Sequence, residues 1–378
     1  MPRIIVLGAG RVGRVIARDL ADDESIEITV ADRRSSLVDE VSEKLACEGI
    51  CDNLGDERVI TRLVADHDLV IGALPGALGL QTMRGVIDAG KPYVDISFMP
   101  EDPRVLDKRA RDTGARVLCD FGVAPGMSNL LAAATAAENG VPRQVRILVG
   151  GLPALRRQPW EYAAPFSPAD VMEEYVRPAR VKVGGEIVER PALSGLELVE
   201  FPEIGTLEAF YTDGLRSLID TLDCPSMEEK TLRYPGYAEK IQLLKESGFF
   251  SDEPVEVNGV RVVPREVTLK LLEPVWHLDD TMDDFTVMRV SVTSGAQAPY
   301  RRVHWDLLDQ TDRSAKETAM SRCTGFPAAI AARRILDGSA DLAPGVNPPE
   351  ALAGNEAFVR GLLDDLRARG VVYRREDT

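Results

Sequence analysis

The first residues in the chain that could do chemistry are the glycines of the motif GAGRVG, which begins at residue 8. Gly8 permits a tight turn after an apolar run, Gly10 lets the backbone approach a pyrophosphate, and Gly13 allows the next helix to pack closely on the strand. The N–H groups at the start of that helix would point at the anion. The motif therefore predicts a dinucleotide site formed by Gly8, Gly10, Arg11, Val12 and Gly13.

The choice of cofactor depends on Asp32, which follows Gly13 by 19 residues and ends the second apolar run. A carboxylate at this place accepts both hydroxyls of the adenosine ribose and repels a 2′-phosphate, so NAD is the expected cofactor. Arg33 and Arg34 follow at once, and they would bind that phosphate if Asp32 turned away. NADP is therefore the less favoured alternative.

The elements that must position these residues follow from the pattern between residues 3 and 120, where short apolar runs alternate with amphipathic stretches. This pattern predicts parallel strands joined by helices, in a right-handed doubly wound sheet of the Rossmann type. The expected strands are residues 3–7, 27–31, 68–72, 93–96 and 116–119, with a weaker strand at 49–51.

Ligands of such sheets lie outside the carboxyl ends of the strands, so the residues that follow the strands are candidates for the site. Ala73, Leu74 and Pro75 follow the fourth strand and are assigned to the cofactor. Ser97 and Phe98 follow the fifth strand and are assigned to the substrate.

The segment DFGVAPGMSN begins at Asp120, after the sixth strand. It forms a turn with few side chains, in which Gly122 and Val123 are expected to face the nicotinamide and Ala124 the substrate. An acid buried without a partner costs several kcal/mol, so Asp120 is more often part of a site than of a core at this place. Asp120 is therefore a candidate acid or base.

Beyond residue 120 the segments become longer and alternate with period two, which predicts a mixed, largely antiparallel sheet with a hairpin turn at Gly184 and Gly185. A Rossmann domain is expected at residues 1–120, completed by about 323–378 through a helix that returns to it. Residues 121–322 are expected to form a domain for substrate binding and dimerisation.

The composition excludes several classes of function. The chain carries 61 acidic and 45 basic residues, a net charge of −16, which repels nucleic acid and anionic membranes. No apolar run is long enough for a membrane span or a signal peptide, so a cytoplasmic protein is expected. The five cysteines include no C-x-x-C pair and the three histidines stand far apart, so no metal site is expected.

Five strings carry a resemblance: HDLVIGALP from residue 67, DFGVAPGMSN from 120, VGGLP from 149, LEAFYTDGLRSL from 207 and KTLRYPGYAEKIQLLKESGFF from 230. With these strings in this order, the sequence resembles the saccharopine dehydrogenase family, which includes lysine 6-dehydrogenases. The resemblance implies a Rossmann domain joined to an α/β substrate domain, and a homodimer. It also implies oxidation of the C–N bond at the ε-carbon of an N-substituted lysine by hydride transfer to nicotinamide, followed by hydrolysis of the imine.

Two residues point to different substrates within that family. Ala124 stands where glutamate-forming saccharopine dehydrogenases tend to carry an acid, which favours a lysine 6-dehydrogenase acting on free lysine. Arg216 stands where lysine 6-dehydrogenases tend to have a loop rich in glycine and threonine, which favours a substrate with further carboxylates. A non-catalytic NAD-binding sensor is a second alternative, which Arg216, Thr231 and Arg233 disfavour.

A small amino acid is therefore the expected substrate, with Arg216 and Arg233 as an arginine cluster for its carboxylates. Tyr162 lies in the string PWEYAAPFSP and is a second candidate acid or base, if this loop closes over the substrate; a packed surface loop is the equal alternative. The residues assigned to the substrate are Ser97, Phe98, Ala124, Gly151, Arg216, Thr231 and Arg233.

Overall fold

The computed structural model describes residues 1–164, 166–279, 281–295 and 297–378, and it divides into two compact units. Unit 1 comprises Met1–Gly140, Arg216–Leu222 and Ser321–Tyr373, and unit 2 comprises Val141–Leu215, Asp223–Met320 and Arg374–Thr378. The divisions differ from those expected after residues 120 and 322, because residues 121–140 and the short segment Arg216–Leu222 cluster with unit 1.

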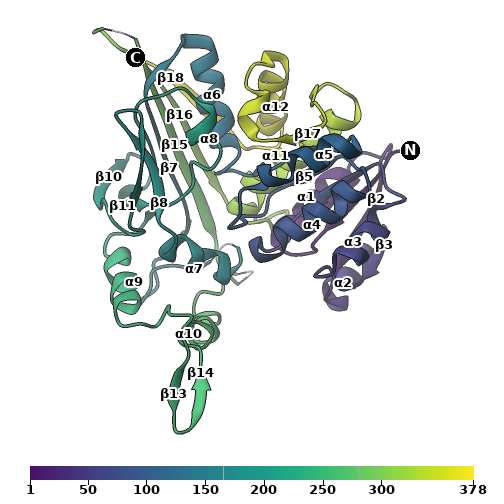
Figure 1. The fold of residues 1–378 in the computed structure, drawn as a ribbon, viewed down its shortest axis with the longest axis horizontal. Helices are drawn as coiled ribbons and strands as arrows, with labels where there is room; N and C mark the ends of the chain where they lie inside the picture. The colour runs from purple at the N-terminus through teal and green to yellow at the C-terminus, as the bar shows by residue number, and fades with distance from the viewer. Residues whose placement is uncertain (165, 280, 296) are drawn as a thin grey trace. The chain divides into compact units, whose positions relative to one another are not determined.

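The sheet of unit 1 has seven parallel strands in the order β17-β6-β5-β4-β1-β2-β3. Figure 1 labels β17, β5, β2 and β3 of this sheet. The predicted doubly wound sheet is confirmed, and the C-terminal part of the chain adds β17 at its edge. The strands are β1 (Arg3–Leu7), β2 (Glu27–Asp32), β3 (Glu48–Cys51), β4 (Leu69–Gly72), β5 (Tyr93–Asp95), β6 (Arg116–Leu118) and β17 (Gly345–Asn347).

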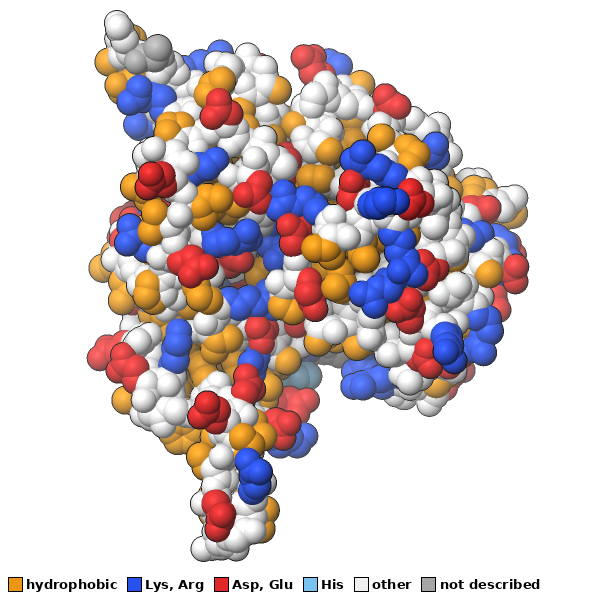
Figure 2. All heavy atoms as spheres, in the orientation of Figure 1, with side chains coloured by type: hydrophobic (Ala, Val, Ile, Leu, Met, Phe, Trp, Pro, Cys, Tyr) orange, Lys and Arg blue, Asp and Glu red, His pale blue; other side chains and the backbone are white. Residues whose placement is uncertain are grey.

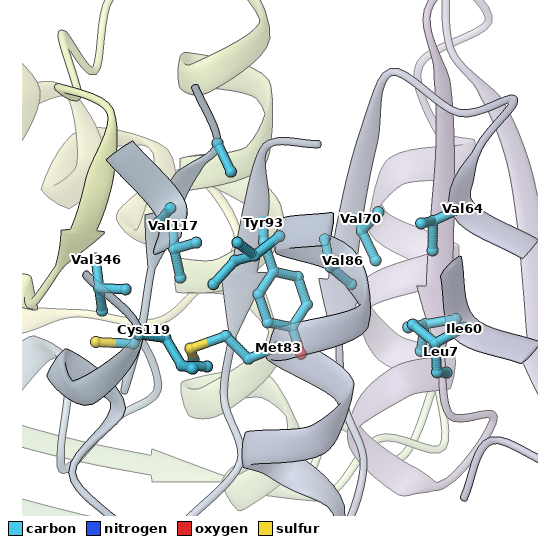
Figure 3. Close-up of a cluster of buried hydrophobic side chains, with 14 of the residues drawn as sticks. Leu7, Ile60, Val64, Val70, Met83, Val86, Tyr93, Val117, Cys119 and Val346 are labelled. Atoms are coloured by element: carbon cyan, nitrogen blue, oxygen red, sulfur yellow. The ribbon is translucent and has the colours of Figure 1, made fainter. Parts of the chain in front are cut away.

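Both faces of the inner strands of this sheet are buried, as parallel strands require. Ile5 and Leu7 of β1 belong to one apolar cluster, which Figure 3 shows between the strands and the helices α3 and α4. Ile4 and Val6 point to the opposite face and are equally buried.

The helices of unit 1 are α1 (Arg11–Ala21), α2 (Ser35–Leu45), α3 (Glu57–Val64), α4 (Gly76–Asp88), η1 (Pro103–Leu106), α5 (Asp107–Thr113), α6 (Met127–Asn139), α8 (Leu218–Thr221), α11 (Ala319–Leu336), which begins in unit 2, η2 (Pro349–Leu352) and α12 (Glu356–Ala368).

The C-terminal segment of unit 1 is joined to α1 by a buried carboxylate. Gly325 of α11 faces Val12, Val15 and Ile16 of α1, where any larger side chain would press on them. Asp19 of α1 is 4% exposed and accepts hydrogen bonds from Arg333 of α11 and from Arg369, which follows α12. One anion therefore ties both C-terminal helices to the first helix of the chain.

The sheet of unit 2 is mixed and largely antiparallel, as predicted, with the order β10-β11-β12-β7-β15-β16-β18 and with β8 pairing to β12 and β9. Strands β12 and β7 run parallel, whereas β10–β11, β11–β12, β7–β15 and β15–β16 run antiparallel. The strands are β7 (Pro142–Pro153), β8 (Ala179–Val183), β9 (Glu186–Arg190), β10 (Glu197–Phe201), β11 (Gly205–Tyr211), β12 (Met227–Arg233), β15 (Asp284–Ser294), β16 (Arg301–Gln310) and β18 (Tyr373–Asp377).

The hairpin predicted at Gly184 and Gly185 is confirmed: both residues have positive φ, 62° and 91°, and they join β8 to β9. In the segment 215–222 only Leu218–Thr221 (α8) is helical. Unit 2 also contains α7 (Pro168–Val176), α9 (Tyr237–Glu246), α10 (Pro264–Leu272) and a small hairpin of β13 (Val255–Val257) and β14 (Val260–Val262).

Figure 2 shows acidic and basic side chains interspersed on the face in view. Within the described ranges, every helix is too short or too polar to span a bilayer.

The hydrogen bonds of Asp19 with Arg333 and Arg369 predict a loss of stability when this carboxylate is removed. Replacing Asp19→Ala leaves Arg333 and Arg369 without their shared anion, so we expect the free energy of unfolding to fall by about 2 kcal/mol. Asp112→Ala is the matched control, because its ion pair with Lys108 is exposed and contributes less than about 1 kcal/mol. Urea denaturation measures both; an equal loss in the two variants would contradict the assignment.

Candidate active site

The glycine motif forms the turn between β1 and α1. Gly8 has φ of +110°, and a Cβ built there would lie 2.4 Å from the carbonyl oxygen of Ala73. A Cβ at Gly13 would lie 1.8 Å from the carbonyl oxygen of Gly8, so neither glycine tolerates a side chain. Gly10 has no atom within 4 Å of its added Cβ, and no side chain caps α1 there. This open backbone at a helix N-terminus fits a pyrophosphate.

The residues after β4 meet the glycine turn, as the strand-end rule predicts. Ala73 donates its N–H to Leu7, and its carbonyl lies against Gly8. Pro75 precedes the first residue of α4 and provides no side-chain cap for it. Ala73, Leu74 and Pro75 are therefore placed beside the turn that contains Gly8.

Asp32 has protein partners for its carboxylate. It is 6% exposed, and its Oδ2 accepts the N–H of Ala9 at 2.9 Å. Its Oδ1 accepts the N–H and the Nε of Arg34, at 3.0 and 3.3 Å. Asp32 thus stabilises the glycine turn through its hydrogen bond with Ala9. Arg33 and Arg34 are exposed.

The turn after β6 is held by backbone hydrogen bonds. Met127 and Ser128, which begin α6, donate to the carbonyls of Gly122 and Val123 at 2.9 and 3.0 Å. A Cβ at Gly126 would lie 2.1 Å from the carbonyl oxygen of Gly122. Gly122 and Val123 are buried, and Ala124 is half-buried in the middle of the turn.

Asp120 and Arg216, predicted separately as acid/base and substrate residues, contact each other in unit 1. The Nε of Arg216 donates to Oδ2 of Asp120 at 3.1 Å, and its Nη2 donates to the carbonyl of Glu101. The guanidinium also lies over the ring of Phe98, 5.6 Å from its centroid. Both side chains are at most 5% exposed, so this is a buried ion pair.

Asp95 is a further candidate for the site, which the sequence analysis did not select. It ends β5, is 1% exposed, and accepts hydrogen bonds from the Tyr93 hydroxyl and the Ser97 hydroxyl, both at 2.7 Å. Burial, with a smaller contribution from the nearby Asp120, raises the pKa of Asp95 from 3.8 to about 7. The rule that ligands bind at strand ends would have selected Asp95, because it is the last residue of its strand.

The remaining predicted residues lie in unit 2, where Tyr162 and Arg233 contact each other. Arg233 is 3% exposed, pairs with Glu174 at 2.8 Å, and lies 4.6 Å from the ring centroid of Tyr162. Tyr162 is 5% exposed and packs edge-on against Trp276, which favours the packed loop over a loop that closes on the substrate. Burial raises the pKa of Tyr162 well above 10, which is unsuitable for proton exchange near neutral pH.

Arg216 and Arg233 thus belong to different units, and each pairs with a carboxylate of its own unit. Thr231 shares a 2.8 Å hydrogen bond with the hydroxyl of Thr212, which itself donates to Glu229. Burial raises the pKa of Glu229 to about 8. Gly151 lies in the interior of β7, opposite Thr286 of β15.

Both units of the chain are similar to proteins of a known family. Residues 4–118 match the family model described as "Saccharopine dehydrogenase NADP binding domain", and residues 122–371 match "Saccharopine dehydrogenase C-terminal domain". The saccharopine dehydrogenase [NADP(+), L-glutamate-forming] of Schizosaccharomyces pombe is 26% identical over 100% of this chain and 99% of its own length.

The alpha-aminoadipic semialdehyde synthase of Bos taurus is 28% identical over 63% of this chain, and the match spans only 27% of that longer protein. Among solved structures, the apo saccharopine dehydrogenase (L-Glu forming) of Saccharomyces cerevisiae has a TM-score of 0.82 and 18% identity, with both chains fully covered. This likeness shows that the fold is shared.

The raised pKa of Asp95 predicts how stability changes with pH. In the folded state Asp95 holds its proton up to about pH 7, whereas in the unfolded chain it loses it near pH 4. Stability should therefore fall as pH rises from about 4 to 7, since the folded state binds more protons in that range. We expect Asp95→Asn to reduce the difference in unfolding free energy between pH 5 and pH 8, measured by urea denaturation. Asp220→Asn, an exposed carboxylate of unit 1, should leave that difference unchanged; an unchanged slope in Asp95→Asn would contradict the assignment.

Proposed function

Because the chain belongs to the saccharopine dehydrogenase family, we propose that it is an NADP-dependent oxidoreductase that oxidises the C–N bond at the ε-carbon of saccharopine. The match to the family over both of its domains, together with the open glycine turn of unit 1, carries this proposal. When bound, the nicotinamide would accept a hydride from the carbon of the C–N bond, and water would then hydrolyse the resulting imine.

The residues of unit 1 that would hold the dinucleotide are those of the glycine turn and its neighbours. The backbone at Gly10 and the N-terminus of α1 fit the pyrophosphate, because a Cβ built at Gly10 would meet no atom within 4 Å and no side chain caps the helix. Ala73, Leu74, Pro75, Gly122 and Val123 would complete the cofactor site, since each follows a strand of the same parallel sheet.

NADP replaces NAD as the favoured cofactor for two reasons. The family model is described as NADP-binding, and the S. pombe relative is named for NADP(+). The carboxylate of Asp32 is hydrogen-bonded to Ala9 and Arg34, so it supports the turn, and two exposed arginines follow it. We therefore assign the ribose 2′-phosphate to Arg33 and Arg34.

The substrate is proposed to be saccharopine, because the relatives that the chain matches along most of its length carry that name. Free lysine is the second candidate, which the absence of an acid at Ala124 favours. Ser97, Phe98 and Ala124 lie on the turns of unit 1 that follow β5 and β6, and we retain them as substrate residues. Gly151, Thr231 and Arg233 of unit 2, and the homodimer, stay predictions.

The assignment of the 2′-phosphate to Arg33 and Arg34 predicts a selective loss of affinity for NADP+. The double variant Arg33→Ala, Arg34→Ala should raise the Kd for NADP+ by about 100-fold, since it removes charge-assisted contacts to the 2′-phosphate. The Kd for NAD+ should change by less than about threefold, because NAD+ lacks that phosphate. Titration calorimetry measures both, with Lys108→Ala as a control for loss of an exposed cation. Equal losses for the two dinucleotides would contradict the assignment.

The activity itself is tested by following absorbance at 340 nm with NADP+ and either saccharopine or L-lysine. We expect kcat/KM for saccharopine to exceed that for lysine by about 100-fold or more, a difference of about 2.7 kcal/mol. Turnover of lysine alone would instead establish the lysine 6-dehydrogenase alternative. Tight dinucleotide binding without turnover of either amine would favour the sensor.

A further inference from the structure

One stretch of unit 2 carries an excess of exposed apolar side chains. Residues 249–275, here called the apolar arm, make up 27 of the 378 residues of the chain. They include seven of the 17 large apolar side chains that are exposed in the described part of the chain: Phe249, Val255, Val257, Val260, Val267, Leu271 and Val275. Single exposed apolar side chains are ordinary, but such a concentration is typical of a surface that another molecule covers.

The hairpin of the apolar arm, β13 and β14, has one face made of valine alone. Its valines stand opposite each other in two registered pairs, Val255 with Val262 and Val257 with Val260. Between these pairs Glu256 stands opposite Arg261, and both point to the other face, because side chains alternate along a strand. Three of the four valines are between 49% and 61% exposed. An isolated two-stranded hairpin is marginally stable in water, so packing of this face against another surface would stabilise it.

The helix α10 extends the apolar surface of the arm. It packs on the rest of unit 2 through Thr268 and Leu272, which are buried. Val267 and Leu271 each precede one of these residues, so they lie together on a second face of the helix, where they are 44% and 66% exposed. A surface helix normally carries polar side chains away from its buried face. The valine face and this helix face are continuous along the chain, because only Val263 separates β14 from α10.

The base of the apolar arm is fixed to the rest of unit 2. Arg265, in the first turn of α10, donates its backbone N–H to the carbonyl of Ser251 at 3.1 Å, which closes the hairpin at its base. Its guanidinium pairs with Glu173 of α7 and with Asp252. Figure 1 shows the hairpin extending from α10 away from the sheet of unit 2. The valine face is therefore presented on an anchored support.

We propose that the apolar arm is the contact surface for a second copy of this chain, in a two-fold symmetric dimer whose arms pack valine face to valine face. A two-fold contact requires a surface that is complementary to itself, and registered pairs of identical apolar side chains meet this requirement. The size also fits, because each partner in a standard interface contributes about 20–30 residues. This gives the expected homodimer a surface, and it is independent of the proposed function.

The charges of the hairpin favour a second copy over a strongly charged partner. The strands β13 and β14 carry one acid and one base, Glu256 and Arg261, so the hairpin is neutral. The whole chain has a net charge of −16, so two copies repel each other over most of their surface. A neutral apolar face is where two such chains approach with the least repulsion, and it offers no attraction to nucleic acid or to an anionic membrane.

The test measures the oligomeric state of the full chain by sedimentation velocity. We expect the wild-type chain to form a dimer, and the double variant Val257→Lys, Val260→Lys to raise the dimer Kd by about 100-fold or more, because ammonium groups would enter an apolar contact. Both positions are exposed in the single chain, so the substitutions leave its fold intact. The double variant Val183→Lys, Ile187→Lys is the matched control, since it changes two exposed apolar side chains of the other hairpin of unit 2, β8 and β9, and should leave the Kd unchanged.

Hydrogen exchange of the wild-type chain, followed by mass spectrometry at two chain concentrations, locates the contact without any substitution. We expect the amides of residues 255–262 to exchange at least about tenfold more slowly where the dimer is populated than where the monomer is, with no change in β8 and β9. A monomeric wild-type chain, a dimer that persists in Val257→Lys, Val260→Lys, an equal loss in the control variant, or exchange in the arm that does not depend on concentration would overturn the proposal.

Discussion

A guanidinium that leaves water needs a carboxylate within hydrogen-bonding distance, because the removal of an ionised group from water costs several kcal/mol. In unit 1 this constraint joins Arg216 to Asp120, and both residues take positive φ, 50° and 52°, to meet. Such a backbone is unfavourable for residues other than glycine and persists only where the surroundings impose it. The segment Arg216–Leu222 clusters with unit 1 although its neighbours in sequence belong to unit 2.

Further contacts of that segment strengthen the same attachment. Arg104 pairs with Asp220, and the Thr221 hydroxyl donates to Glu350, so the segment is tied to the loop after β5 and to the C-terminal part of unit 1. The residues that follow β5 and β6 are thereby held in place by the segment Arg216–Leu222, which is distant from them in sequence. Precise placement of this kind is what a binding site needs from its supporting residues.

In both units, charged side chains in the positions of ligand-binding residues are bound to other protein groups. The role of such a residue therefore has to be inferred from its partners. Asp32 has the position of a ribose-binding acid, yet its carboxylate supports the glycine turn through Ala9. Arg233 has the position of a substrate arginine, yet it is enclosed by Glu174 and by Tyr162 and Tyr175. In each case at least one partner, Ala9 for Asp32 and Glu174 for Arg233, is distant in sequence, so the residue type alone does not reveal the role.

The sequence by itself determined the doubly wound sheet, the glycine turn and the mixed second sheet, because these depend on local periodicity and on glycine's freedom at positions such as Gly8 and Gly184. The strand-end rule also located Asp120, Ala73 and Ser97 at one edge of the first sheet. Only the tertiary structure decided that the returning C-terminal segment adds the strand β17 to that sheet, that Tyr162 is buried, and that Asp120 contacts Arg216. The physical reason is that burial and ion pairing join residues tens to hundreds of positions apart, such as Asp19 and Arg333, and no local pattern records which distant partner a charged side chain will find.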